Sequence, residues 1–230
     1  MTTGAVREDL PTGEELARLS SELERRPASA AVSWALERFG PDGVVVSSSF
    51  QDSVLIDVAT SVAPAIQVVF LDTGFHFPET LEYVEAVRLR YDLNLTIIRP
   101  DVDAATWPCG TDECCRVRKV EPLNRLLRGR SAWITGLRRS EAPTRAGAPV
   151  VAQDPTRGVV KVNPLATWTD LDVSGYTADR GLLVHPLTER GYLSIGCAPT
   201  TTPVRPGDDP RSGRWAGTDK TECGLHEPGS

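Results

Sequence analysis

The sequence predicts an α/β protein, with a mostly parallel sheet and helices on both faces. Short apolar runs such as 44–47 and 132–136 alternate with longer segments whose apolar residues recur at helical spacing. The runs are hydrophobic throughout, which is typical of parallel strands buried on both faces. With 230 residues, 40% of them hydrophobic and 24% charged, the chain is long enough to bury a sizeable core.

Two helices are expected before the first strand, over 13–26 and 28–39, the second stopped by Gly40 and Pro41. Strands are then expected at 44–47, 66–71, 95–98 and 132–136, with an edge strand at 159–162. Helices are expected at 52–61, 78–91, 114–127 and 169–179, with Pro78 and Thr169 suited to the first turns of theirs. This order divides the chain into an N-terminal helical segment (1–40), an α/β domain (41–197) and a flexible C-terminal tail rich in glycine and proline (198–230).

The charge is low overall but concentrated in one stretch. A net charge of −6 argues against a general nucleic-acid binder. Residues 116–145 nevertheless hold nine basic and two acidic side chains, which favours a site for a small, strongly anionic ligand. The competing interpretation is a solvated helix face.

Residues 1–9 contain no apolar signal-peptide core, and no apolar run approaches the roughly 20 residues that cross a bilayer. We therefore expect a cytoplasmic protein that does not use a membrane. Thiols stay reduced in the cytosol, so five cysteines favour metal binding or catalysis over disulfides.

Three loops follow expected strands and therefore meet at one edge of the sheet. The first contains Ser47, Ser48 and Ser49 and is suited to phosphate binding, although such serines are also common helix caps. The second spans 71–74, where a glycine permits close approach of the backbone. The third spans 136–145 and carries three arginines, which either bind an oxyanion or form surface ion pairs.

The cysteines form two groups. Cys114 and Cys115 are adjacent at an expected helix start and, with Cys197, suggest a shared metal cluster; Lys119 lies on the helix face of Cys115. Cys223 lies in the tail near arginines and a lysine, which is the profile of a nucleophile, although a stray thiol is the alternative.

Taken together, these motifs resemble the assimilatory adenylyl-sulfate and phosphoadenylyl-sulfate reductases, within the adenine nucleotide alpha hydrolase-like class. The resemblance runs from about Val44 to His226. It is carried by the serine loop 47–53, Leu71-Asp72-Thr73-Gly74, Cys114-Cys115 with Lys119, Gly136-Leu137-Arg138-Arg139, Arg211-Ser212-Gly213-Arg214-Trp215 and Lys220-Thr221-Glu222-Cys223-Gly224-Leu225-His226.

The resemblance implies roles for these positions. Cys223 would attack the sulfur of adenylyl sulfate, releasing AMP and leaving a Cys S-sulfonate that thioredoxin or a similar dithiol resolves to sulfite, in sulfate assimilation and cysteine biosynthesis. The substrate-binding positions would be Ser47, Ser48, Ser49, Leu71, Thr73, Gly74, Lys119, Gly136, Arg139, Arg145, Arg211, Arg214 and His226. The oligomeric state stays open, a homo-oligomer included.

In the cluster-containing branch of the family, paired cysteines and a distant C-x-x-C hold a 4Fe–4S cluster. Here Cys114, Cys115 and Cys197 match three ligands, but Thr200 stands at the fourth position, and a hydroxyl is a poor iron ligand beside thiolates. Three outcomes are open: a three-iron or labile cluster; replacement by Cys109 after a loop rearrangement; or no cluster. We expect impaired cluster chemistry that Thr200→Cys restores.

Two further functions are weighed against adenylyl-sulfate reduction. One is a cluster-impaired or inactive homologue that only binds nucleotide, and the other is reduction of the 3′-phosphorylated substrate. A ligase or sulfurtransferase of the same fold is disfavoured because Phe50 and Gln51 stand where its loop needs glycines.

Overall fold

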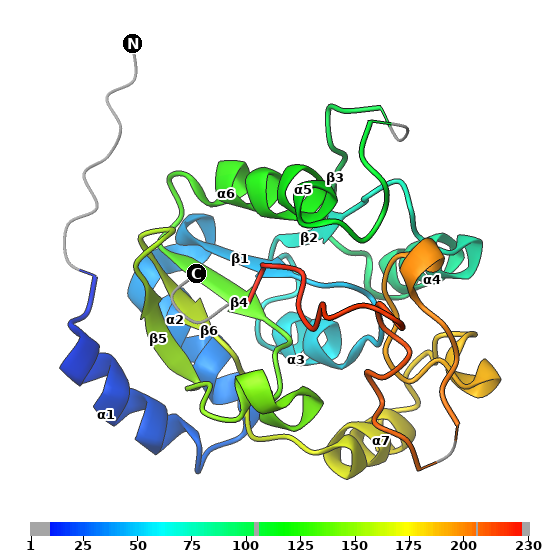
Figure 1. Ribbon diagram of the computed structural model, residues 1–230. Helices are drawn as coiled ribbons and strands as arrows, with labels where there is room; N and C mark the ends of the chain where they lie inside the picture. Colours follow the sequence, from blue (N-terminus) through cyan, green and yellow to red (C-terminus); the bar gives the residue numbers. More distant parts are fainter. Residues whose placement is uncertain (1–9, 104–105, 206, 227–230) are drawn as a thin grey trace.

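The computed structural model describes residues 10–103, 106–205 and 207–226 (Figure 1). The expected absence of a signal peptide in 1–9 and the end of the tail, 227–230, fall outside these residues. The described strands form one six-stranded sheet in the order β3-β2-β1-β4-β6-β5. They are β1 (Val44–Ser47), β2 (Val68–Leu71), β3 (Leu95–Ile98), β4 (Ala132–Thr135), β5 (Val151–Asp154) and β6 (Val159–Val162).

The expected parallel sheet is confirmed for five strands, and the sixth differs. Neighbouring strands from β3 through β6 pair in parallel, with Val46 opposite Ile134 at the centre. β5 is antiparallel to β6 and was not expected. β6 was expected at the edge, but it pairs on both sides and β5 takes the edge position. The turn at 155–158 allows this because Gly158 adopts a left-handed φ of 61°.

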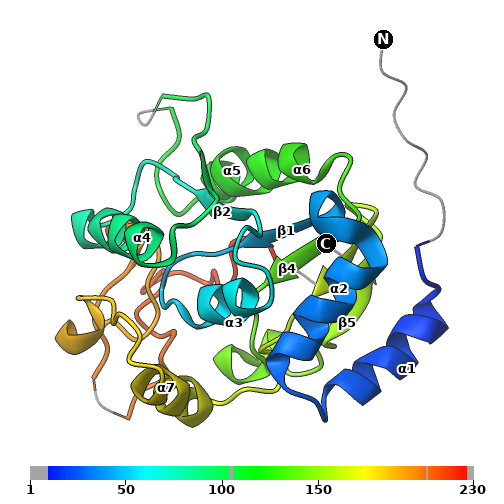
Figure 2. The ribbon, with the colours of Figure 1, turned by 180° about the vertical axis from the view of Figure 1, so that it is seen from behind.

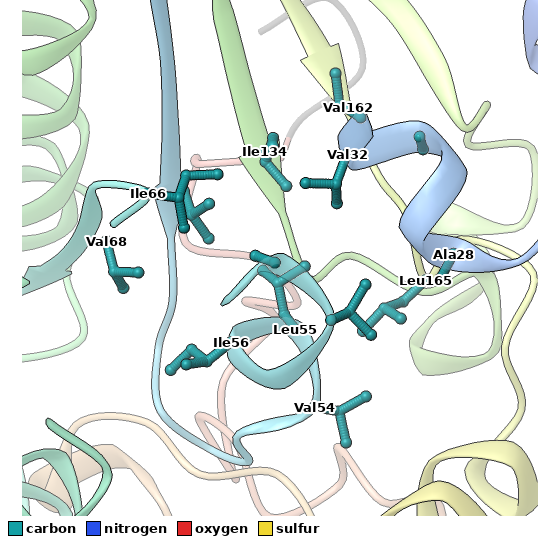
Figure 3. Packing of buried hydrophobic residues seen from close by; sticks show 14 of the residues in the cluster. Ala28, Val32, Val54, Leu55, Ile56, Ile66, Val68, Ile134, Val162 and Leu165 are labelled. Carbon is teal, nitrogen blue, oxygen red and sulfur yellow. The ribbon is translucent and has the colours of Figure 1, made fainter. Parts of the chain in front are cut away.

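One face of the sheet is covered by most of the helices. These are α1 (Gly13–Leu23), α2 (Ala28–Gly43), α3 (Val54–Val62), α4 (Pro78–Tyr91) and α7 (Asp170–Asp179). α1 and α2 lie beside the sheet in the reverse view (Figure 2). Val32 of α2 and Ile56 of α3 are fully buried with Ile134 of β4, and Figure 3 shows them in one cluster. The N-terminal helices therefore share the core of the α/β domain.

The opposite face carries a single bent helix and the tail. α5 (Asp112–Cys115), a π-helical turn (Arg116–Val120) and α6 (Glu121–Leu127) are continuous along the chain. The π turn arises next to Pro122, which lacks the N–H that an α-helix needs, and Glu121 N–H donates to Arg116 O instead. Leu123 and Leu127 bury against Trp133, and Leu225 of the tail packs on the same cluster.

Short 3-10 turns connect the rest: Arg139–Glu141, Pro143–Arg145, Thr188–Arg190 and Ala198–Thr200. Among the described residues, no helix combines the length and apolar character that spanning a bilayer requires. Beyond the last of these turns, the described tail runs back across the ends of β1 and β4, as the red trace in Figure 1 shows.

Candidate active site

A cavity lies where the strand order reverses. β1 and β4 are neighbours in the sheet. β2 and β3 lie on the β1 side of this pair, and β6 and β5 lie on the β4 side. Parallel sheets bind ligands at the carboxyl ends of strands at such a switch point. Five expected substrate-binding residues line this cavity together: Ser47 at the end of β1, Ser48 and Ser49 after it, Leu71 at the end of β2 and Gly136 after β4.

The serine loop is fixed by its own hydrogen bonds. Ser48 Oγ accepts from Phe50 N at 3.0 Å, and the buried Phe50 is held at a left-handed φ of 55°. Ser47 Oγ accepts from Trp133 Nε1 at 2.7 Å, while Ser49 stays exposed. A strained non-glycine residue in a loop that ends a strand is typical of a binding site.

Cations from separate parts of the chain meet on the cavity wall. Lys119, Arg145, Arg211 and Arg214, all expected to bind the anionic group, line it. Arg145 and Arg211 both donate to the carboxylate of Glu222, the residue before Cys223. The cavity wall therefore holds more basic than acidic side chains, the acidic ones being Asp52, Glu141 and Glu222.

Arg214 has unused hydrogen-bonding capacity. Its Nε is buried and has no partner among the described residues. Gly196 packs so closely that a Cβ there would clash with the guanidinium, and the Trp215 ring centroid lies 4.5 Å from Cζ. Burial, and then Arg211, lower the pKa of Arg214. A buried donor without a partner on the wall of a cavity suits an anionic ligand.

The tail places Cys223 at this cavity. Trp215, 5% exposed, anchors it, and Arg211 Nη2 donates to Thr221 O at 2.9 Å. Thr201 pairs with Arg214 in an isolated antiparallel bridge. Cys223 is half-buried and lines the cavity. The position expected to carry the nucleophile therefore faces the cationic wall.

His226 is the last described residue of the tail. Its ring stacks on Trp133 with centroids 5.6 Å apart and planes 8° apart, and Nδ1 is buried with no partner in the described chain. Burial, followed by the charges of Lys161, Arg145, Arg157 and Arg211, holds its pKa well below 6.5. The docked His226 is therefore neutral.

A second, smaller cavity contains the remaining cysteines. Cys114, Cys115 and Cys197 are buried and line it together with Cys109, Thr200 and Lys119. Hydrogen bonding between the Cys109 thiol and the Cys197 thiol raises the pKa of Cys109 and lowers the pKa of Cys197.

Two lysines link the two cavities. Lys119 lines both; burial opposes its charge, but the sulfurs of Cys197, Cys223 and Cys115 outweigh that and raise its pKa. Lys220, three residues before Cys223, donates from Nζ to Cys115 Sγ at 3.3 Å and to Asp112 Oδ1 at 2.8 Å. The tail is thus tied to the helix start that carries the paired cysteines.

Three of the expected substrate-binding residues lie elsewhere. Arg139 donates to Glu24 and to Ala148 O, because the turn after β4 directs it toward α1 and away from the cavity. Thr73 lines the cysteine cavity, and its Oγ1 lies 3.4 Å from Cys197 Sγ. Gly74 lines neither cavity.

Arg138 and Glu222 are among the cavity residues that the sequence analysis did not assign to the site. Arg138, next to Arg139, lines the cavity and donates to Asp170 Oδ1 at 2.7 Å. Glu222 stands in the 220–226 motif, but the sequence analysis gave it no role, and it lines the cavity. The sequence held no signal to separate Arg138 from Arg139, since only the local turn decides which of them points inward.

In the described ranges, no three His, Cys, Asp or Glu side chains converge closely enough for a single metal ion. A four-iron cluster makes a different demand, because each of its thiolates binds a separate iron atom and the sulfurs stand farther apart than around one ion.

The fold is that of the adenine nucleotide alpha hydrolase-like class, with a mostly parallel sheet and helices on both faces. The fold matches FMN adenylyltransferase from Candida glabrata with a TM-score of 0.60 at 18% identity, over 83% of this chain and 72% of the other. It matches the phosphoadenylyl-sulfate (PAPS) reductase from Candida auris, solved as a phosphate complex, with a TM-score of 0.74 at 26% identity, over 84% of this chain and 99% of the other.

Sequence comparison narrows the class to a family. Residues 43–203 match the phosphoadenosine phosphosulfate reductase domain. The adenosine 5'-phosphosulfate reductase of Mycolicibacterium smegmatis is 48% identical over 91% of this chain and 92% of its own length. The enzyme of that name from Mycobacteroides abscessus is 45% identical over 98% and 99%. The chain belongs to the phosphoadenosine phosphosulfate reductase family, as the motifs predicted.

Proposed function

We propose that this protein reduces adenylyl sulfate to sulfite and AMP, with Cys223 as the nucleophile and a thioredoxin-like dithiol as the reductant, in the cytoplasm. The observation that carries the proposal is the convergence of Cys223, five cations and the serine loop on one switch-point cavity. The relatives named as adenosine 5'-phosphosulfate reductases favour this substrate.

In the first step, Cys223 Sγ as the thiolate forms a bond to the sulfur of the sulfate group. The bond from that sulfur to the bridging phosphate oxygen breaks, and AMP leaves with its electron pair. Lys119, Arg211 and Arg214 stabilise the charge that develops on the phosphate. The serine loop holds the nucleotide from the other side.

In the second step, one thiolate of the dithiol attacks Sγ of the sulfonated Cys223. The new disulfide bond forms as sulfite leaves with the electron pair of the former sulfur–sulfur bond. The second thiol of the reductant then displaces Cys223, which returns as a thiolate. The dithiol thus supplies the two electrons that convert the sulfur of the substrate into sulfite.

A 4Fe–4S cluster fits the cysteine cavity. Its donors are buried thiols, and Arg118 Nε on its wall is buried without a partner among the described residues, as expected where an acceptor such as sulfide belongs. Cys114, Cys115 and Cys197 would hold the cluster. When bound, it would tie the start of α5 to the loop before Thr200 and set its negative charge against Lys119.

The 3′-phosphorylated nucleotide is the alternative substrate, favoured by the name of the matched domain and of the Candida auris enzyme. A protein that only binds nucleotide is the other alternative, because Thr200 stands at a cluster position.

One assay separates these functions. Anaerobically prepared protein is given thioredoxin with either nucleotide, and sulfite and AMP are measured. We expect both products from adenylyl sulfate, at a kcat/KM at least tenfold above that of the 3′-phosphorylated form, and no sulfite from Cys223→Ser. The reverse preference would identify the alternative substrate, and bound nucleotide without sulfite would overturn the reductase.

A further inference from the structure

The loop before α5 places Cys109 in the cysteine cavity. Gly110 follows it with a left-handed φ of 98°, which turns the chain sharply into the helix. Thr111 caps that helix by accepting from Cys114 N at 3.2 Å, and its hydroxyl donates back to Pro108 O at 3.0 Å. These bonds fix the chain beside Cys109, which lines one cavity with the paired cysteines.

Cys109 lies next to the position that Thr200 occupies. Cys109, Thr200 and Cys197 line the same small cavity. The two loops touch: a Cβ on Gly110 would lie 2.7 Å from Thr200 Cγ2. Cys109 therefore already lines the cysteine cavity in the loop conformation observed.

Thr200 itself is poorly suited to bind iron. Its hydroxyl is neutral and hard, and thiolates are the favoured ligands of iron–sulfur clusters. The hydroxyl is also within 3.4 Å of Cys197 O, to which it donates. The cavity therefore offers four sulfur donors, from Cys109, Cys114, Cys115 and Cys197, and the Thr200 hydroxyl does not compete with them.

We propose that Cys109 supplies the fourth thiolate of the cluster, so that the ligand set is complete despite Thr200. This proposal rests on the proposed function, in which the chain holds a 4Fe–4S cluster. Each of the four thiols loses its proton as its sulfur bonds to a separate iron atom. The fourth ligand has moved from the loop after Cys197 to the loop before α5, beside the same corner of the cavity.

The test measures iron and acid-labile sulfide per chain in full-length protein purified without oxygen, with electron paramagnetic resonance spectra. Four proteins are compared: the natural chain, Cys109→Ser, Thr200→Cys, and the two changes combined. We expect about four irons in the natural chain. Cys109→Ser is expected to lose at least a quarter of the iron and to show the signal of an oxidised three-iron cluster. Thr200→Cys alone should change neither the iron content nor the electron paramagnetic resonance spectrum.

The combined variant is the matched control for folding. If Cys109→Ser removes only a ligand, adding Thr200→Cys in that background returns the iron content to that of the natural chain. Equal iron in Cys109→Ser and the natural chain would overturn the proposal. The proposal would also be overturned if the natural chain held less iron and Thr200→Cys raised its iron content, since the site would then lack a ligand.

Failure of the proposed function gives a different pattern. If no variant, Thr200→Cys included, holds iron, the chain has no cluster, and both the cluster and the role of Cys109 are overturned. Sulfite release that depends on Cys223 is measured separately and reports on the reductase activity without reference to iron.

Discussion

Arg145 and Glu222 form a two-point ion pair directly before the nucleophile. Arg145 Nε and Nη2 each donate at 2.8 Å to a different carboxylate oxygen of Glu222, and the two side chains are only 8% and 10% exposed. Such fork geometry orients both partners as well as attracting them. Because Glu222 adjoins Cys223, this pair fixes where the tail holds its thiol.

Glu222→Gln is therefore expected to loosen the tail. Loss of the charged hydrogen bonds should cost about 1.5–3 kcal/mol of docking free energy, measured as faster hydrogen exchange at residues 218–225. The matched control is Glu85→Gln, which breaks an exposed pair with Arg88 and should leave the tail unchanged. Equal exchange in Glu222→Gln and the natural chain would show that the pair does not hold the tail.

Docking of the tail should also weaken as the pH falls below about 6.5. The pKa of docked His226 is held well below 6.5, so a released tail binds a proton that the docked tail does not. Acid therefore favours release. Glu222 does not obscure this window: burial raises its pKa, but Arg145 outweighs that and holds it below 4.5, so its contribution is lost only at lower pH.

The measurement is the rate of proteolysis in the tail between pH 8 and pH 5. His226→Phe keeps a ring for stacking on Trp133 and removes the titrating group, so its rate should not change with pH in this window once protease activity is corrected. If the proteolysis rate of the natural chain were as insensitive to pH as that of His226→Phe, the burial of a neutral His226 would be contradicted.

Lys119 and Arg139 make a matched pair for substrate affinity. Lys119 faces both cavities, whereas Arg139 bonds to Glu24 and Ala148. Lys119→Met should raise the dissociation constant for adenylyl sulfate by about 10- to 100-fold, the equivalent of one charged hydrogen bond. Arg139→Met should leave it within about twofold. Calorimetric titration of the Cys223→Ser background measures both, and equal losses would contradict the placement of Arg139.

Gly196→Ala tests how Arg214 is positioned. A Cβ at Gly196 would clash with the guanidinium, while Gly175 in α7 has no atom within 4 Å of a built Cβ. Gly196→Ala should displace Arg214 and weaken binding of adenylyl sulfate at least tenfold in the same titration, with Gly175→Ala as the control. Unchanged binding in Gly196→Ala would mean that Arg214 does not contact the substrate.

Much of the fold could be predicted from the sequence because many strands and helices have patterns among residues that are close along the chain. Val44–Ser47 and Ala132–Thr135 were found because buried parallel strands are apolar throughout. Val151–Asp154 was missed because two of its four residues, Gln153 and Asp154, are polar and break the apolar run. Its place at the sheet edge depends on pairing with β6, which is a tertiary contact.

The site was predictable to a similar degree. Loops that follow parallel strands meet at one edge, so the serine loop and Gly136 were expected together. The direction of each side chain was not predictable, as Arg138 and Arg139 show. The closeness of Cys109 to Thr200 was equally hidden, because their loops are 91 residues apart and meet only in the folded chain.

The central claim is that Cys223 accepts the SO₃ group from a nucleotide, and mass spectrometry of the intact protein tests it most directly. After adenylyl sulfate is added without a reductant, the account predicts a chain heavier by one SO₃, mapped by peptide analysis to Cys223 and absent from Cys223→Ser. The same adduct should disappear when thioredoxin is supplied. An unmodified Cys223 in protein that demonstrably binds the nucleotide would contradict the account.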